Sequence, residues 1–261
     1  MLDQLIVKPG SEADLRGRDP RDLHGAPDKE DGKKHLDAFL EELRDLQERL
    51  YAEHTRSVLL VLQGLDASGK DGTIRHVFTG VNPQGCSVTS FKAPTPVELA
   101  HDFLWRIHAQ CPSRGMIGIF NRSHYEDVVT VRVLGLAPKA VWRERPRRIV
   151  EFERLLADEG TTVLKCFLQV SAEEQQKRFE ERMSNPTKRW KYNPADEETN
   201  RRYDEFTEAY DEAISATSTE HAPWHVIPAD RNWLRNLAVA TVIVEALRKL
   251  DPQFPEALPR V

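Results

Sequence analysis

The chain has 261 residues, 39% of them hydrophobic, and a formal net charge of −5 at pH 7. This length allows one substantial α/β core, and the acidic balance argues against a protein whose whole surface binds nucleic acid or membrane. The sequence opens without a signal-type segment and contains no run of about 18 apolar residues, so a cytoplasmic location is expected.

The N-terminal part is polar. Residues 8–34 are rich in Asp, Gly, Pro, Lys and Arg with little apolar periodicity, so residues 1–34 are predicted to form an extended arm. From His35 onward, apolar residues recur at helical spacing and predict a helix with one apolar stripe. The stripe consists of Leu36, Phe39, Leu40, Leu43, Leu46 and Leu50.

Strand-like and helix-like segments alternate through the rest of the chain. Strands are predicted at 58–62, 87–91, 116–120, 162–168 and 224–227. Helices are predicted at 97–108, 145–158, 172–183, 197–214 and 232–250. The alternation predicts an α/β fold, a doubly wound parallel sheet of five strands with helices on both faces. Residues 35–255 are assigned to this domain and 256–261 to a tail.

A glycine-rich turn follows the first predicted strand and precedes a helix-like segment. Its Gly-x4-Gly-Lys spacing is that of a P-loop, in which backbone N–H groups and a helix N-terminus bind phosphate. Lys70 would add a charge and is expected to face solvent, while Asp71 stands where Ser or Thr usually supplies a hydroxyl to magnesium. The candidate phosphate-binding residues are Gly64, Ala67, Ser68, Gly69, Lys70, Asp71, Gly72 and Thr73.

Polar residues also follow the strand at 116–120, at the edge where open α/β sheets bind ligands. Arg122 suits the neutralisation of a transferring phosphoryl group. Asp66, Glu126 and Asp127 are the acids available to hold magnesium, and Asp66 is favoured because it lies inside the loop. Its alternative role is to cap the next helix or to hydrogen-bond its own turn. His124 and Tyr125 are interpreted as packing or orienting residues.

Basic residues concentrate between 177 and 191. Beside a phosphate loop, a Pro-bounded basic segment is typical of a lid, here at about 184–200; a solvated surface is the alternative. The candidate phosphate-binding residues of this segment are Arg178, Arg182, Lys188, Arg189 and Lys191. Trp190 is interpreted as an anchor that packs the lid, with stacking on a nucleotide base as the alternative. The arginines at 143, 145, 147 and 148 either extend this basic track or form a solvated helix start.

Three motifs in order, Gly64–Thr73, Phe120–Val128 and Asn185–Lys191, give the chain a resemblance to the family-2 polyphosphate kinases across roughly residues 35–255. The residue patterns alone reach only a P-loop phosphotransferase. The resemblance implies a P-loop kinase fold related to thymidylate kinases, with Mg²⁺, or Mn²⁺, assisting transfer between inorganic polyphosphate and a nucleotide. Many members have Asp at the strand end, followed by Arg-Ser-Trp-Tyr-Asn.

The resemblance also implies residue roles. Asp66 would hold the metal, Lys70 and Arg122 would act at the transferring phosphate, and the lid positions would be Arg182, Lys188 and Lys191. The variant Asn-Arg-Ser-His-Tyr-Glu resembles the class III subgroup, which phosphorylates both AMP and ADP. It makes Glu126 a replacement carboxylate, catalytic or acceptor-selecting. The nucleotide-binding candidates are Asn121, Glu126, Asp127 and Trp190.

The expected function is therefore transfer of a phosphoryl group from polyphosphate to AMP and ADP, forming ADP and ATP. An ATP-dependent nucleotide or small-metabolite kinase is one alternative, and a non-catalytic nucleotide-sensing module is another. The expected partners are polyphosphate and the nucleotides, without nucleic acid or membrane. The family's habit and the apolar stripe together predict a homo-oligomer, a dimer or a tetramer.

Overall fold

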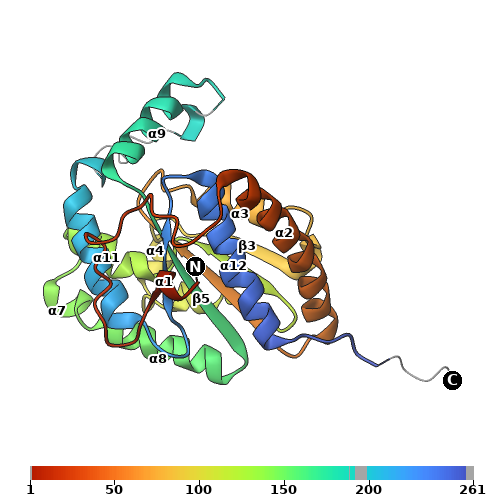
Figure 1. Cartoon of the computed structure of the whole chain (residues 1–261). Coiled ribbons are helices and arrows are strands. Elements are labelled where there is room, and N and C mark those ends of the chain that lie inside the picture. The colour runs from red at the N-terminus through yellow and green to blue at the C-terminus, as the bar shows by residue number, and fades with distance from the viewer. Residues whose placement is uncertain (1, 188, 192–198, 257–261) are drawn as a thin grey trace.

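The computed structural model describes residues 2–187, 189–191 and 199–256. A six-stranded sheet with the order β1-β6-β5-β2-β4-β3 forms its centre (Figure 1). The five predicted strands are all present, and they pair with one another in parallel. They are β2 (Ser57–Gln63), β3 (Cys86–Ser90), β4 (Ile117–Asn121), β5 (Thr161–Gln169) and β6 (Trp224–Pro228).

The predicted count of five strands is wrong by one. β1 (Ile6–Val7) adds an antiparallel edge to β6, within the segment predicted to be an extended arm. A strand of two residues is too short to produce a periodic signal in the sequence, so only its pairing reveals it.

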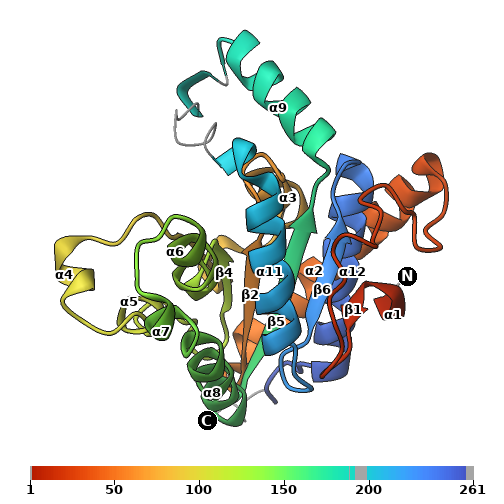
Figure 2. The same ribbon diagram turned by 90° about the vertical axis from the view of Figure 1, so that its left-hand side faces the viewer.

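Helices cover both faces of the sheet, as predicted (Figure 2). α2 (Lys29–Glu53), α3 (Lys70–Val77) and α12 (Asn232–Leu250) pack together on one face. α6 (Val129–Val133), α8 (Arg145–Asp158) and α11 (Tyr203–Thr217) pack together on the other. The 3₁₀ helices are η1 (Pro83–Gly85), η2 (His124–Asp127) and η3 (Arg189–Lys191). The remaining helices named here are α1 (Leu2–Leu5), α4 (Pro96–Leu99), α5 (Trp105–His108), α7 (Lys139–Trp142) and α9 (Ala172–Ser184).

The helix predicted at 97–108 is instead two short helices, α4 and α5. The side chain of Asp102 accepts the backbone N–H of Leu104 at 2.9 Å between them. Such a turn competes with continuous helix, because it satisfies the backbone donor locally. The segment thereby bends along the β3 edge of the molecule, where α4 stands away from the sheet (Figure 2).

The N-terminal segment is more ordered than an extended arm. α2 begins at Lys29, inside the predicted arm, because the Asp28 carboxylate caps the N–H groups of Glu30 and Asp31 at 2.8 and 3.0 Å. Earlier in the segment, Ala13 and Leu15 are buried. Their backbone N–H groups donate to side chains of α11. These polar contacts anchor the segment, and they produce no apolar periodicity in the sequence.

The apolar stripe of α2 is satisfied within the chain. Leu43, Leu46 and Leu50 are buried, and α2 packs along α12. The stripe therefore gives no support to the predicted oligomer, which stays a prediction. Within the part of the chain that the structure covers, no helix is both long and apolar enough to cross a membrane.

Candidate functional site

The turn between β2 and α3 has the shape of a phosphate-binding loop. Gly64, Ala67 and Gly69 have φ angles of 148°, 60° and 103°, in or near the left-handed region that favours glycine. A Cβ on Gly69 would also collide with the guanidinium of Arg235, and one on Gly64 would lie 2.7 Å from the carbonyl oxygen of Leu168. Close packing against neighbours thus requires both glycines, and the loop leads directly into the N-terminus of α3.

Lys70 is buried rather than solvent-facing. Its ammonium donates to the carbonyl oxygens of Gly64 at 2.6 Å and Leu65 at 3.1 Å. Burial, together with the charge of the nearby Arg122, lowers the pKa of Lys70 to about 8, although Asp66 and Glu126 oppose this shift. The expectation of an exposed lysine is wrong because the loop folds over its own side chain.

The second predicted motif lies beside the loop. β4 neighbours β2, and Asn121 stands opposite Leu62 in the sheet. Arg122, with φ of 65°, donates to the Asp66 carboxylate at 2.5 Å, and Asn121 donates to Asp71 at 2.8 Å. The carboxyl ends of two adjacent strands therefore bring the charged residues of both motifs together.

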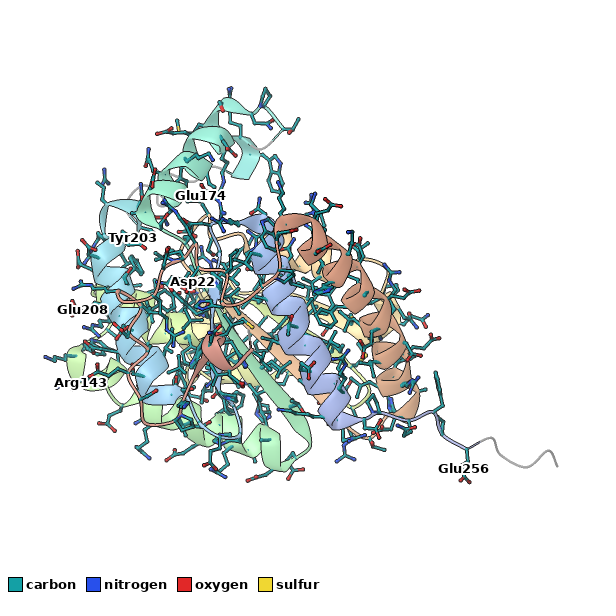
Figure 3. All side chains as sticks on the ribbon, in the orientation of Figure 1. Asp22, Arg143, Glu174, Tyr203, Glu208 and Glu256 are labelled. Carbon is teal, nitrogen blue, oxygen red and sulfur yellow. The ribbon has the colours of Figure 1, made fainter. Side chains whose placement is uncertain are left out.

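Arg178 lies behind the loop and not at its concave side. Its Nη1 donates to the carbonyl oxygens of Ala67 and Ser68, and its Nη2 to those of Ala229 and Asp230, at 2.7–3.2 Å. The remaining Nε donates to Glu174, near the base of α9 (Figure 3). All five N–H donors of the guanidinium are therefore used, and the prediction that Arg178 binds phosphate does not fit this geometry.

A second buried arginine supports the same loop. Arg235 is 3% exposed, contacts Asn232 at 2.8 Å, and fills the space left by the missing side chain of Gly69. Burial, together with the charge of Arg178, lowers the pKa of Arg235 to about 10. Sequence reasoning missed this residue, since an arginine inside an apolar helix carries no motif.

Two more residues near Asp66 were not predicted. Gln175 donates from Nε2 to the backbone oxygen of Asp66 at 2.8 Å. Tyr210 is buried, and this burial, reinforced by the charge of Glu126, raises the pKa of its hydroxyl well above the usual value. These residues enclose the loop from α9 and α11.

The remaining loop residues do not all face a ligand. Ser68 and Thr73 are fully buried. No partner of the Thr73 hydroxyl is found among the residues that the structure describes. Gly72 lies against Arg235, where a Cβ would be 3.3 Å from the guanidinium. These three positions therefore shape the loop from within.

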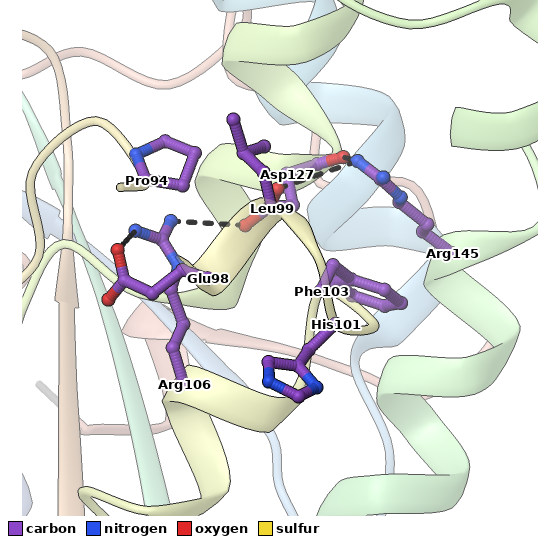
Figure 4. A pocket seen from close by; sticks show the side chains of 8 residues that line it. All are labelled: Pro94, Glu98, Leu99, His101, Phe103, Arg106, Asp127 and Arg145. Atoms are coloured by element: carbon purple, nitrogen blue, oxygen red, sulfur yellow. Dashed lines mark hydrogen bonds and ion pairs between the residues drawn. The ribbon is translucent and has the colours of Figure 1, made fainter. Parts of the chain in front are cut away.

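Glu126 and Asp127 point to different surroundings. Glu126 accepts the hydroxyl of Thr130 at 2.6 Å. Asp127 lies between Arg106 at 3.3 Å and Arg145 at 3.5 Å, and burial raises its pKa against the pull of these two cations (Figure 4). Arg145 therefore belongs to an ion pair rather than to a basic track.

These charged groups line a cavity of about 100 Å³. The cavity is formed by Pro94, Glu98, Leu99, His101, Phe103, Arg106, Asp127 and Arg145 (Figure 4). Figure 4 shows both arginines directed at Asp127 from opposite sides. This lining of ion-paired acids and arginines with aromatic rings differs from the backbone N–H groups of the loop, so the cavity suits a different part of a substrate.

A buried polar network holds η2 from below. Lys165 donates to the Glu153 carboxylate at 2.6 Å and to the Tyr125 hydroxyl at 2.9 Å. His124 lies 3.2 Å from Glu153, and all four side chains are at most 1% exposed. His124 and Tyr125 thus orient the segment, in agreement with their interpretation from the sequence.

The lid candidate extends from α9, which projects away from the sheet (Figures 1 and 2). Arg182 lies over the Phe179 ring at 5.4 Å, and Arg189 donates to the carbonyl oxygen of Met183 at 3.2 Å. Trp190 is 77% exposed, so the favoured interpretation of this residue as a packed anchor of the lid is wrong. Lys188, residues 192–198 and the side chain of Lys191 lie outside the described residues.

The residues present fit a magnesium ion shared with a substrate. No group of three or more Asp, Glu, His or Cys side chains suited to a metal occurs in the described ranges. Asp66 and Asp71 nonetheless both lie at the loop, beside Arg122 and Asn121. Mg²⁺ commonly binds through one or two carboxylates together with substrate phosphates and water, which this pair allows.

Comparison with known proteins places these features in context. Residues 26–255 match the protein family described as Polyphosphate kinase 2. The AMP/ADP-polyphosphate phosphotransferase of Meiothermus ruber is 52% identical over 98% of this chain and 96% of its own length. The ADP-polyphosphate phosphotransferase of Rhodopseudomonas palustris is 44% identical over 88% of this chain and 85% of its own.

A solved structure agrees with the sequence comparison. The crystal structure of polyphosphate kinase 2 from Arthrobacter aurescens superposes with a TM-score of 0.94. The match is 42% identical in sequence, and it covers 99% of this chain and 93% of that one. The P-loop kinase-type fold is therefore shared along nearly the whole length.

Proposed function

The chain belongs to the polyphosphate kinase 2 family, and from this premise we propose that it transfers a phosphoryl group from inorganic polyphosphate to AMP and ADP, forming ADP and ATP. One observation carries the proposal: Asp66, Lys70 and Arg122 converge on the phosphate loop in a chain 52% identical to a relative named for both acceptors. A sensing module would not need this set of charges.

The transfer is a displacement at phosphorus. An oxygen of the acceptor phosphate bonds to the terminal phosphorus of the donor, and the bond from that phosphorus to the bridging oxygen breaks. The shortened polyphosphate leaves with both electrons of the broken bond. Catalysis rests on positioning and electrostatic stabilisation, without a covalent enzyme intermediate.

Lys70 and Arg122 are assigned to the transferring phosphoryl group. Lys70 is held by the loop carbonyls, so it is pre-oriented before substrate arrives. The Asp66 carboxylate holds the guanidinium of Arg122 in place, so Arg122 would contact Asp66 and the substrate phosphate together. Asp66, with Asp71 beside it, would hold Mg²⁺ or its waters, and the ion supplies further charge stabilisation when bound. Mn²⁺, with the same preference for oxygen ligands, is an allowed substitute.

Glu126 and the neighbouring Asp127 cavity are assigned to the acceptor. Glu126 and Asp127 lie in η2, which follows β4, and the charge of Glu126 acts on the pKa values of Lys70 and Tyr210. The acceptor phosphate would lie near Glu126 and Asn121. The lid, with Arg182 and Arg189, and Lys188 and Lys191 as sequence candidates, would close over the donor and exclude water.

The test is donor choice. Purified protein with Mg²⁺ and ADP is expected to form ATP when polyphosphate is the only donor, and AMP is expected to give ADP and then ATP. Lys70→Ala serves as the matched inactive control. An ATP-dependent kinase would leave polyphosphate untouched and phosphorylate a different acceptor from ATP, which would contradict the proposal.

A further inference from the structure

A basic cavity lies at the same edge of the sheet as the phosphate loop but outside the site described above. It has a volume of about 540 Å³ and is lined by Lys29, Lys33, Arg231, Asn232 and Trp233. Two elements far apart in sequence form it, the first turns of α2 and of α12. They meet where the Trp233 ring packs on Gly32, which leaves no room for a Cβ.

The three cations of this cavity are unpaired within the described part of the chain. Among those residues, no hydrogen bond or ion pair of the Lys29, Lys33 or Arg231 side chains is found, although α2 carries several acids nearby. Those acids are occupied elsewhere. The Asp28 carboxylate caps the helix, and the Lys34 ammonium forms ion pairs with Asp31 at 2.8 Å and Glu30 at 3.4 Å.

Two side chains link the wall of the cavity to the phosphate loop. Asn232 in its wall accepts from Arg235 at 2.8 Å, and Arg235 packs against Gly69 of the loop. In the sheet order, β6 and α12 lie on one side of β2, whereas β4 and the acceptor cavity lie on the other. Figure 2 shows α2 with α12, and α4 with α5, on opposite sides of β2.

We propose that this cavity is a distal donor subsite, which holds the phosphates of a long polyphosphate chain beyond the transfer point. The inference rests on the proposed function and extends it from the terminal phosphate to the rest of the polymer. An in-line displacement requires the leaving chain and the acceptor to lie on opposite sides of the transferring phosphorus, and the two cavities lie on opposite sides of β2.

The chemistry favours a polyphosphate rather than a nucleotide. Three exposed cations attract phosphates at any register, while the Trp233 ring is engaged by Gly32 and the cavity offers no second aromatic side chain to sandwich a base. The chain's net charge of −5 makes this unpaired positive cluster a local feature rather than part of a general basic surface.

The test compares long and short donors. The triple variant Lys29→Gln, Lys33→Gln, Arg231→Gln is expected to raise the KM for long-chain polyphosphate about tenfold, the scale of three exposed charge contacts. The KM values for tetrapolyphosphate and ADP should change less than twofold. Arg231 is the residue before α12 but caps it with no side-chain bond, so the change should not disturb the helix.

A control triple variant, Lys8→Gln, Lys139→Gln, Lys249→Gln, makes the same change in net charge at residues outside the cavity. It should leave the preference for long donors unchanged. Equal changes for long and short donors, no change for either, or an equal loss in the control variant would each overturn the proposal.

A second measurement needs no catalysis. Long-chain polyphosphate should protect Lys29 and Lys33 of the unmodified protein from acetylation, as measured by mass spectrometry, whereas tetrapolyphosphate should not. Lys249 is the internal reference. Unprotected lysines would overturn the subsite. A wild-type protein that forms no ATP from any polyphosphate would instead contradict the proposed function, so the two failures are distinguishable.

Discussion

The two sides of the phosphate loop hold their charges in different ways. On the side that we propose binds the acceptor, Asp127 is placed between Arg106 and Arg145, and Glu153 is paired with Lys165 in the core. On the side that we propose binds the donor, the cavity between α2 and α12 presents cations without partners among the described residues. Paired, buried charges fix the position of a small substrate, whereas exposed, unpaired charges attract a polymer without fixing its register.

The largest expected effect comes from disrupting the buried ion pair of Lys165 and Glu153. Lys165→Met leaves the Glu153 carboxylate buried without its cation, which should lower the free energy of unfolding by about 3–5 kcal/mol. Thermal and urea unfolding measure this change. The double variant Lys165→Met, Glu153→Leu removes both charges and should recover much of the loss. If the double variant were as unstable as the single one, packing and not the ion pair would explain the effect.

The next effect concerns the loop lysine, a buried charge that serves function. Lys70→Met should lower turnover by about 10² or more, the scale of a lost electrostatic contact to a transition state. Because burial disfavours the charged lysine, the melting temperature should stay the same or rise. Lys34→Met, on the surface of α2, is the control. Turnover close to that of the wild type would exclude Lys70 from the mechanism.

Lys70 also sets an expected pH dependence. Its pKa of about 8 means that the ammonium is lost as the pH rises through this value in the free enzyme. The ratio kcat/KM for the donor should therefore fall above pH 8, by up to about tenfold per pH unit. Lys70→Arg should abolish this decline, since a guanidinium stays charged. A decline that persists in Lys70→Arg would assign it to another group.

The same shift has a consequence for stability, with a defined sign. A lysine whose folded pKa is lowered from 10.5 to about 8 binds fewer protons in the folded state than in the unfolded state between these values. The free energy of unfolding should therefore rise with pH across this window. In Lys70→Met this contribution should disappear, which chemical denaturation at several pH values would detect.

The comparison also separates what the sequence could predict from what it could not. The glycine loop, the strand end with Arg122 and the five parallel strands carry local patterns, and the structure places them together. The partners of an arginine carry no such pattern. Arg178 and Arg182 lie one helical turn apart in α9, yet the first buttresses the loop and the second stacks on Phe179. Only tertiary contacts decide between them.

The burial of individual side chains was also not predictable from the sequence. Lys70 is buried because the loop folds over it, and Trp190 is exposed although aromatic residues usually pack. The unpaired cations at Lys29 and Lys33 lie in a segment that the sequence predicted as an arm, because the cap at Asp28 gave a weaker signal than the surrounding polar residues. Charge clusters assembled from distant segments need the fold to reveal them.

The smallest expected effect sharpens the description of the acceptor side. The charge of Glu126 raises the pKa of Lys70, and its carboxylate accepts a hydrogen bond from the Thr130 hydroxyl. Because ADP carries more negative charge than AMP, a carboxylate near the acceptor phosphates should disfavour ADP more. Glu126→Asn should therefore raise the ratio of the ADP rate to the AMP rate by about two- to fivefold, as expected for one partly exposed charge contact.

Thr130→Val separates charge from position at this residue. It removes the hydrogen bond to Glu126 at 2.6 Å while keeping the carboxylate, so the ratio of the two rates should move less than in Glu126→Asn. Initial rates with each nucleotide at saturating polyphosphate measure the ratio directly. If Glu126→Asn changed both rates by the same factor, Glu126 would act on transfer in general, and acceptor selection would have to reside in the paired charges around Asp127.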